Sequence, residues 1–232
     1  MSNPRVIVAL DYPSADQALE FVNGITPSQC KLKVGLELFS VGGPAFVHSL
    51  VDNSFDVFLD LKFHDIPTTV ARACAAVARL RVWMLNVHTL GGAQMLRAAR
   101  EAVDAASYTP LLVGVTVLTS HSQQELELIG LQGKLQDNVD TLAGLAHNAG
   151  LDGVVCSPRE VAGLRGKFGE NFVLVTPGIR AGKVEGDDQT RTLSPKEAMR
   201  AGADYLVIGR PVTQAPDPRA VLDRVNAELQ SA

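Results

Sequence analysis

Apolar positions along the chain follow two alternating periods. Short runs rich in β-branched residues are separated by longer stretches in which apolar residues recur every three or four positions, patterns typical of strands and amphipathic helices. The short runs predict eight strands, at residues 5–10, 31–36, 56–62, 82–88, 111–118, 153–156, 172–176 and 205–209. The longer stretches predict helices at residues 14–23, 44–52, 68–80, 93–106, 135–148, 158–166, 195–201 and 219–230.

The regular order of these elements, one strand and then one helix, predicts repeated βα units. Gly150 and Gly202 each follow a helical stretch and precede a strand, which is the position of a left-handed helix cap. Eight such units in 232 residues favour a closed (β/α)8 or TIM barrel over a doubly wound open sheet, which usually has fewer strands. No linker divides the chain, so we expect a single barrel domain over residues 1–232.

Composition narrows the classes of function. The formal net charge of −4 comes without any lysine- or arginine-rich block, which argues against nucleic acid or an anionic membrane as the main partner. The three cysteines lie far apart, so we expect buried, reduced thiols. No apolar run approaches about 18 residues and no signal peptide precedes the first strand. We therefore expect a cytoplasmic protein with a small-molecule partner.

Polar residues gather where the predicted strands end. In a (β/α)8 barrel the active site lies at the C-terminal ends of the strands, so these residues can be considered as one set. They are Asp11, Lys33, Glu37, Asp60, Lys62, His88, Thr119, Ser157, Thr176, Arg180 and Arg210. The sequence has no histidine or cysteine cluster with metal-ligand spacing and no Gly-x-Gly-x-x-Gly turn, so we expect neither a metal nor an organic cofactor.

The most informative segment is DLKFHDIP at residues 60–67. Strand periodicity places Asp60 and Lys62 on the same face, at the end of an apolar strand. Burying two charges costs free energy even when they pair, so a catalytic or ligand-binding role explains this arrangement better than stability does. The alternative is an exposed strand end that carries an ordinary solvated ion pair.

Two further charges are expected to join this pair. Period 2 puts Asp11 on the same face as Ala9 in the first strand, and Lys33 on the matching face of the second strand. Asp11, Lys33, Asp60 and Lys62 would then alternate in sign around the barrel mouth, where the carboxylates keep the lysines protonated. Lys62 would be a proton donor rather than a Schiff-base amine. Asp11 taken alone fits a turn residue equally well.

The ends of the last two strands carry the features of a phosphate site. Gly178 and Gly209 let the backbone approach an anion closely. Arg180 and Arg210 can fork onto phosphate oxygens, and Pro211 suits the first turn of a short helix. Loops at these positions often bind phosphate in such barrels, so we expect a phosphorylated substrate. The alternative is two ordinary glycine turns with solvated arginines.

Residues 181–192 form a polar stretch with neither a helical nor a strand period. A loop of this length in a compact domain is usually functional or disordered, so we interpret it as a lid over the phosphate, with Gln189 as a ligand residue. A simple surface loop is the alternative. His64 and His88 stay ambiguous, because a histidine at a strand end can serve packing alone.

Together these motifs resemble the orotidine 5'-phosphate decarboxylases of the short, stand-alone bacterial type, over essentially the whole chain. The segments that carry the resemblance are ALD (9–11), KLKVG (31–35), DLKFHDIP (60–67), VLTS (117–120), TPGIR (176–180) and IGR (208–210). The third is the most specific. The resemblance implies cofactor-independent conversion of orotidine 5'-monophosphate to uridine 5'-monophosphate and carbon dioxide, the last step of de novo pyrimidine biosynthesis.

The resemblance also implies roles for individual residues. Lys62 would protonate C6 of the pyrimidine, Asp60 would lie beside the substrate carboxylate, and Lys33 would hold Asp60 and the ribose hydroxyls. Asp65 would complete the catalytic set by reaching across a homodimer interface; a helix N-cap is its alternative role. The substrate-binding residues that the resemblance implies are Asp11, Lys33, Ile66, Thr69, Thr119, Arg180, Gln189, Gly209 and Arg210.

Two other functions fit parts of the pattern. The magnesium-dependent 3-keto-gulonate 6-phosphate decarboxylases and hexulose-phosphate synthases share Asp-x-Lys-x-x-Asp after strand three, but they offer an acidic metal ligand where this chain has Lys33. A non-catalytic barrel that senses pyrimidine nucleotides would need Arg180 and Arg210 but not Lys62. Lys33 therefore argues against magnesium, and Lys62 argues against a sensor.

Overall fold

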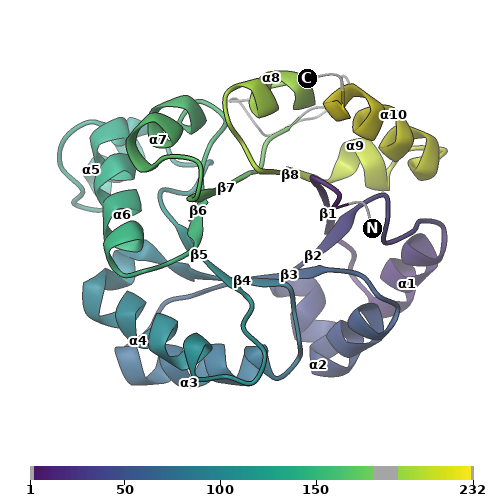
Figure 1. Cartoon of the computed structure of the whole chain (residues 1–232), viewed down its shortest axis with the longest axis horizontal. Helices are drawn as coiled ribbons and strands as arrows, with labels where there is room; N and C mark the ends of the chain where they lie inside the picture. Colours follow the sequence, from purple (N-terminus) through teal and green to yellow (C-terminus); the bar gives the residue numbers. More distant parts are fainter. Residues whose placement is uncertain (1–2, 180–192, 231–232) are drawn as a thin grey trace.

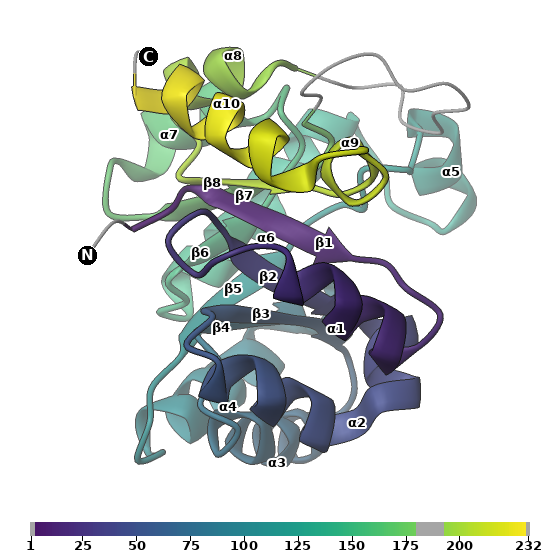
Figure 2. The same cartoon turned by 90° about the vertical axis from the view of Figure 1, so that its right-hand side faces the viewer.

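The chain forms a closed barrel of parallel strands with helices around it, seen down the barrel in Figure 1 and from the side in Figure 2. This computed structural model describes residues 3–179 and 193–230. The strands pair in chain order from β1 to β8, and β8 closes the barrel by pairing with β1. The predicted (β/α)8 barrel is therefore confirmed.

Every predicted strand is present. The strands are β1 (Val6–Leu10), β2 (Lys31–Gly35), β3 (Val57–Phe63), β4 (Met84–His88), β5 (Leu111–Val115), β6 (Gly153–Val155), β7 (Val173–Thr176) and β8 (Tyr205–Ile208). The helices of the described residues are α1 (Ala15–Asn23), α2 (Leu36–Asp52), α3 (Pro67–Ala78), η1 (Thr89–Gly91), α4 (Gly92–Asp104), α5 (Gln123–Leu128), α6 (Leu135–Asn148), α7 (Val161–Phe168), α8 (Pro195–Arg200), α9 (Arg210–Thr213) and α10 (Pro218–Gln230).

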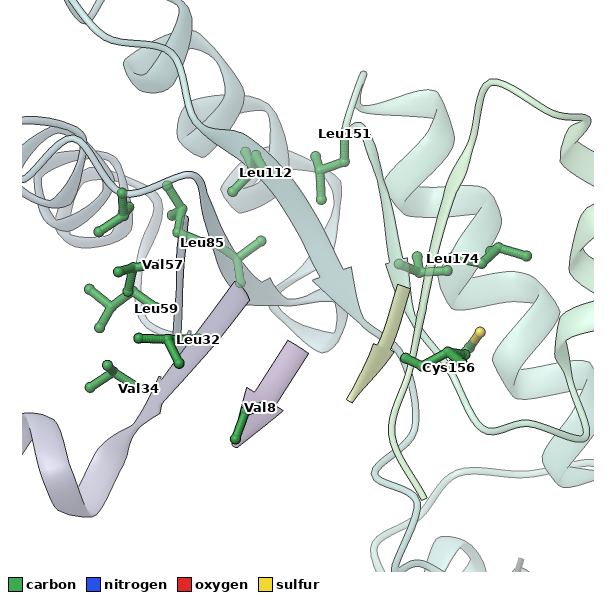
Figure 3. Close-up of a cluster of buried hydrophobic side chains, with 14 of the residues drawn as sticks. Val8, Leu32, Val34, Val57, Leu59, Leu85, Leu112, Leu151, Cys156 and Leu174 are labelled. Carbon is green, nitrogen blue, oxygen red and sulfur yellow. The ribbon is translucent and has the colours of Figure 1, made fainter. Parts of the chain in front are cut away.

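Alternate residues of each strand face two different apolar layers. In β1, Val8 lies in the large core between strands and helices, whereas Ile7 and Ala9 belong to a smaller cluster inside the barrel. Figure 3 shows part of the large core, in which leucine and valine side chains from neighbouring strands point toward the helices. Each such side chain, fully buried, stabilises the fold by roughly 1.5–3 kcal/mol. Because the helices need the apolar faces, the strand faces that carry charge are left to the barrel interior.

The three cysteines lie in this apolar packing. Cys30, Cys74 and Cys156 are all buried and unpaired, as the sequence predicts. Burial raises the pKa of the Cys30 and Cys74 thiols to about 12, which keeps them neutral. A neutral thiol is a poor nucleophile, so these cysteines serve packing.

The barrel interior is closed at the N-terminal ends of the strands. Lys31, the first residue of β2, is 1% exposed, and its Nζ lies 4.3 Å from the centroid of the Trp83 ring. The same Nζ lies 2.5 Å from Oδ2 of Asp56. Tyr205 packs edge-on against Trp83, with ring centroids 4.8 Å apart. A cation–π contact and an ion pair therefore hold this buried amine in the floor of the barrel, far from the C-terminal strand ends.

The sequence prediction lacks the first part of α2, the helix α5 and the short η1. Helix α2 begins at Leu36, and Gly43, with φ of 59°, breaks it just before Pro44, so the periodic pattern revealed only the second part. Helix α5 is too short to show a period, and a capping box between Ser122 and Glu125 fixes its start. The prediction that Glu37 marks the end of the second strand is wrong. Strand β2 ends at Gly35, and Glu37 is an exposed residue in the first turn of α2.

Glycines take the special backbone positions that the turns require. Gly150 and Gly202 have φ of 78° and 106°, which confirms the two predicted left-handed positions after helices. Gly153 serves a different purpose, because a Cβ there would lie 2.0 Å from the carbonyl oxygen of Val173. Gly153 pairs with Val173 in the sheet, so that oxygen cannot retreat without disturbing the β6–β7 ladder.

We expect Gly153→Ala to lower the free energy of unfolding by about 1–3 kcal/mol, because the added methyl group overpacks the β6–β7 contact. The matched control is Gly144→Ala in α6, where no atom lies within 4 Å of the new Cβ. That change should raise the free energy of unfolding by up to about 1 kcal/mol through helix propensity. Chemical denaturation of both variants measures the difference. Equal effects of the two substitutions would contradict this account of Gly153.

Candidate active site

Four charged side chains lie in a row at the C-terminal ends of β1, β2 and β3. Lys62 Nζ is 2.6 Å from Asp60 Oδ1, and Lys33 Nζ is 3.3 Å from Asp60 Oδ2. Lys33 Nζ also lies 3.7 Å from Asp11 Oδ1. The charges therefore alternate in the order Asp11, Lys33, Asp60, Lys62, and we call these four residues the charged row. Strand order alone brings them together, because parallel neighbours end at the same rim.

Asp60 is the buried member of the charged row. It is 8% exposed as a whole residue, and both of its carboxylate oxygens face an ammonium group. Burial by itself would raise the pKa of the Asp60 carboxyl. The charges of Lys33 and Lys62, with hydrogen bonds from Lys62 and Asn86, outweigh that effect and lower the pKa below its usual value. Asp60 is therefore an anion at neutral pH, and the exposed-pair alternative does not describe it.

The backbone at Lys62 departs from regular strand geometry. Its φ is 51°, in the left-handed region that residues with a Cβ rarely adopt. The pairing of β3 with β4 shifts register between Leu59 and Phe63, so Lys62 lies in a bulge. Non-glycine residues in this conformation are held there by their surroundings and concentrate at functional sites.

Asn86 is a member of the site that sequence reasoning missed. It lies in β4, is 1% exposed, and accepts a hydrogen bond from the backbone N–H of Lys62 at 2.7 Å. Its Nδ2 donates to Asp60 Oδ1, also at 2.7 Å. The available signal was an amide within an otherwise apolar strand, two positions before His88 and on the same face.

The charged row borders a cavity of about 520 Å³ at the barrel mouth. This volume suits a small-molecule ligand. Its walls are charged on the side of β1 to β3 and mainly apolar on the side of β5 to β7. The lining residues include all four members of the charged row and, from the predicted set, Thr119, Gly178, Gly209 and Arg210. Arg210 opens the short helix α9, which contains Pro211 as predicted.

Three predicted site residues lie outside this cavity. Asp65, Ile66 and Thr69 are exposed, and Ile66 is 67% exposed. Asp65 and Ile66 line a separate hollow at the rim, next to Leu90. Asp65 does not cap α3, because the N-cap residue is Ile66 and no side chain caps the helix; the N-cap alternative is wrong. Arg180, Gln189 and the proposed lid at residues 181–192 lie outside the described residues.

Two histidines stack beside the charged row. The ring centroids of His64 and His88 lie 5.5 Å apart, and His88 Nδ1 accepts a hydrogen bond from the backbone N–H of Leu90 at 3.4 Å. Burial, together with the positive charges of His64, Lys62 and His121, lowers the pKa of His88 to about 4. His88 is therefore neutral at physiological pH and adds no positive charge next to Lys62.

Within the described residues, no group of three or more histidine, cysteine or acidic side chains is placed to hold a metal ion. The described helices also include none that is both long and apolar enough to cross a membrane.

The sequence of this chain is similar to those of known proteins. The chain matches the family described as "Orotidine 5'-phosphate decarboxylase / HUMPS family" over residues 4–225. A protein of Hydrogenovibrio crunogenus named orotidine 5'-phosphate decarboxylase is 54% identical, over 98% of this chain and 96% of its own length. A protein of the same name from Nitrosococcus oceani is also 54% identical, over 100% of both chains.

A solved structure gives the same result for the fold. The crystal structure of orotidine 5'-phosphate decarboxylase from Lactobacillus acidophilus is 36% identical to this chain and superposes with a TM-score of 0.87. The match covers 97% of this chain and 98% of that chain.

We expect His88 to titrate near pH 4, because burial disfavours its charged form and protonation would place a second cation beside Lys62. The unfolded chain takes up this proton near pH 6.5, so the contribution of His88 to stability is complete above pH 6.5 and is lost as pH falls toward about 4. Histidine ring signals followed by NMR against pH measure the titration. His88→Asn, which keeps an acceptor for Leu90, should remove this part of the pH dependence. Titration of His88 near pH 6.5 would contradict the assignment.

Proposed function

Because this chain belongs to the orotidine 5'-phosphate decarboxylase / HUMPS family, we propose that it converts orotidine 5'-monophosphate to uridine 5'-monophosphate and carbon dioxide in de novo pyrimidine biosynthesis. The observation that carries this proposal is the charged row at the edge of a cavity whose opposite wall is mainly apolar. Decarboxylation leaves an electron pair on the ring, and fixed ammonium groups in a site shielded from water stabilise such charge better than water does. In the proposal, the whole chain forms one barrel domain, and this domain catalyses the decarboxylation.

Lys62 is the proton donor in the proposed mechanism. The bond between C6 and the carboxylate carbon breaks, carbon dioxide leaves, and its bonding electron pair stays on C6. The Lys62 ammonium gives its proton to that pair, which yields uridine 5'-monophosphate and a neutral amine that water reprotonates. Asp60 supports this step because it holds Nζ of Lys62 at 2.6 Å and so fixes the position of the ammonium group.

Lys33 and Asp11 hold the rest of the row in the proposal. Lys33 Nζ bridges Asp60 and Asp11, at 3.3 and 3.7 Å, so it fixes the orientation of Asp60 from the side opposite Lys62. With Asp11 more exposed than Asp60, both Lys33 and Asp11 are within reach of ribose hydroxyls of a ligand in the cavity. Thr119, on the β5 side of the cavity, binds the pyrimidine or ribose.

The phosphate of the substrate is assigned to the β7 and β8 side of the cavity. Gly209 and Arg210 line the cavity there, and we assign Arg180 and Gln189, outside the described residues, to the same group. A phosphate held far from C6 contributes binding energy that orients and desolvates the ring, so it raises turnover as well as affinity.

The reaction needs no cofactor in this proposal. Both carboxylates of the charged row are already paired with ammonium groups that border the cavity, and these ammonium groups would repel a divalent cation. The magnesium-dependent relatives therefore fit this charge pattern poorly. We propose a cytoplasmic enzyme that has neither nucleic acid nor membrane as a partner.

A homodimer completes the active site in the proposal. Asp65, Ile66 and Thr69 face solvent at the rim rather than their own cavity, and Ile66 and Leu90 leave apolar surface exposed around Asp65. Exposed apolar side chains next to an acidic group suit an interface. We assign Asp65 to the catalytic set, and Ile66 and Thr69 to substrate binding, in the partner's site.

The purified chain, stripped of metal by a chelator, should consume orotidine 5'-monophosphate with loss of its ultraviolet absorbance and formation of uridine 5'-monophosphate. Lys62→Ala should reduce kcat by on the order of 10²- to 10⁴-fold or more, because it removes the group that supplies the proton to C6. Lys134→Ala, an exposed lysine away from the cavity, is the matched control and should keep the wild-type rate.

Activity that disappears with the chelator and returns with magnesium would favour the sugar-phosphate relatives instead. Full turnover by the Lys62→Ala variant would contradict its role as proton donor. Binding of the nucleotide without turnover would favour the sensor.

Mixing two inactive variants tests the shared site. In a dimer of Lys62→Ala with Asp65→Ala, one site receives an intact Lys62 and an intact Asp65, and the other site receives neither. Random exchange of subunits should therefore restore about a quarter of the wild-type activity, since half of the dimers are mixed and each has one good site. Rates measured after co-incubation at several ratios give the answer. A mixture no more active than its components would show that Asp65 acts within its own chain.

A further inference from the structure

Asn86 is the buried polar side chain that touches the charged row from a fourth strand. Burying an amide without hydrogen bonds costs free energy. The groups that Asn86 bonds therefore indicate its role. The described contacts are two: the backbone N–H of Lys62 donates to Oδ1, and Nδ2 donates to Asp60 Oδ1, each at 2.7 Å. The orientation of the amide follows from its partners, because a backbone N–H can only donate and a carboxylate can only accept.

The pairing of β3 with β4 explains why an amide is needed. Leu59 pairs with Leu85 and Phe63 pairs with Val87, so three residues of β3 lie opposite the single residue Asn86. Within this bulge the regular ladder is interrupted, and the backbone N–H of Lys62 donates to a side chain, the Oδ1 of Asn86. The Asn86 amide therefore provides an acceptor at the point where the register shifts.

The same contact holds Lys62 in its unfavourable conformation. A residue with a Cβ adopts φ near 51° only when its surroundings compensate a cost of about 1–3 kcal/mol. The hydrogen bond from the Lys62 N–H to Asn86 fixes the peptide on the N-terminal side of the Lys62 Cα. The backbone conformation at Lys62 therefore sets the direction of its Cα–Cβ bond, and with it the part of the cavity that Nζ can reach.

Asn86 also fixes the carboxylate of Asp60. Oδ1 of Asp60 accepts from both Lys62 Nζ and Asn86 Nδ2, at 2.6 and 2.7 Å, while Oδ2 faces Lys33. With both oxygens engaged, the carboxylate cannot rotate without breaking a contact. A neutral amide does this without changing the balance of two negative and two positive charges in the row.

We propose that Asn86 is a positioning residue for the proton donor: one amide holds the Lys62 backbone in its left-handed turn and the Asp60 carboxylate in its orientation, so that Nζ meets C6. This inference rests on the proposed decarboxylation. Asn86 acts through Lys62 and Asp60, so its loss should lower kcat far more than it changes KM. A displacement of about 1 Å at a reacting group can cost on the order of 100-fold in rate.

The isosteric variant Asn86→Asp separates this role from simple packing. While the introduced carboxyl is neutral, its O–H donates to Asp60 and its carbonyl oxygen accepts from Lys62, so both contacts survive. Once ionised, it faces the Asp60 carboxylate, and the two anions repel each other. The ratio of variant kcat to wild-type kcat should therefore fall as pH rises, by about 10- to 100-fold between the two forms.

The experiment measures kcat and KM with orotidine 5'-monophosphate from pH 5 to pH 9 for the wild type, Asn86→Asp and Thr89→Val. Thr89 is a matched control, because it is also fully buried and donates a hydrogen bond to the Val115 carbonyl at 2.7 Å, but it does not touch the charged row. Its ratio to the wild type should not depend on pH. Circular dichroism over the same range checks that the folded fraction stays constant.

A ratio for Asn86→Asp that stays flat with pH, or a variant whose KM rises while kcat is unchanged, would overturn the inference. Should Asn86→Asp not fold at high pH, Asn86→Ala at neutral pH decides: a kcat lowered by about 10-fold or more, with KM within about threefold, supports the role. An unchanged kcat overturns it. A wild-type chain that does not turn over this substrate would overturn the proposed function and this inference together, whereas an active wild type with a flat ratio removes only the inference.

Discussion

A carboxylate placed inside the barrel between two ammonium groups is the constraint on which the other features of this site depend. Asp60 is held as an anion in a position where burial disfavours charge, and the ammonium groups of Lys33 and Lys62, with the hydrogen bond from Asn86, make that possible. The charged row as a whole comes from three parallel strands that are neighbours in both chain order and space, so that their ends coincide. The first three strands of a closed barrel provide this, while the floor of Lys31, Trp83 and Tyr205 fills the opposite end.

The distortion of β3 follows from the same constraint. In a regular strand, the side chains of Asp60 and Lys62 would lie parallel on the same face. Strand β3 departs from this geometry between two points where it pairs with β4. The register shifts in a bulge between Leu59 and Phe63, where the backbone N–H of Lys62 donates to the side chain of Asn86. Backbone strain, a buried amide and a charged pair are therefore found together at this site. Departures from regular structure usually concentrate at functional sites.

Sequence periodicity was enough to predict the barrel and to identify the charged faces of the first three strands. Because side chains alternate with period 2, the alternation by itself assigns Ala9 and Asp11 to the interior, and the charged row follows from strand order. Periodicity fails where an element is too short to show a period, as in α5, or where glycine interrupts it, as in α2. Asn86 escaped for another reason: its role depends on a register shift between two strands, and no pattern within one strand encodes that. The assignments of Asp65, Ile66 and Thr69 came from family resemblance alone, because no periodicity in the sequence marks them and they are exposed outside the cavity of their own chain.

The bulge in β3 has a consequence for protein engineering. The octapeptide at residues 60–67 looks like a portable unit, but the conformation of Lys62 depends on an amide 24 positions later in the chain. Copied alone into another parallel barrel, the peptide would relax toward regular pairing with its new neighbour. The Lys62 side chain would then extend from the backbone in a different direction. The smallest transferable unit is therefore a pair of adjacent strands with their mismatch in length preserved.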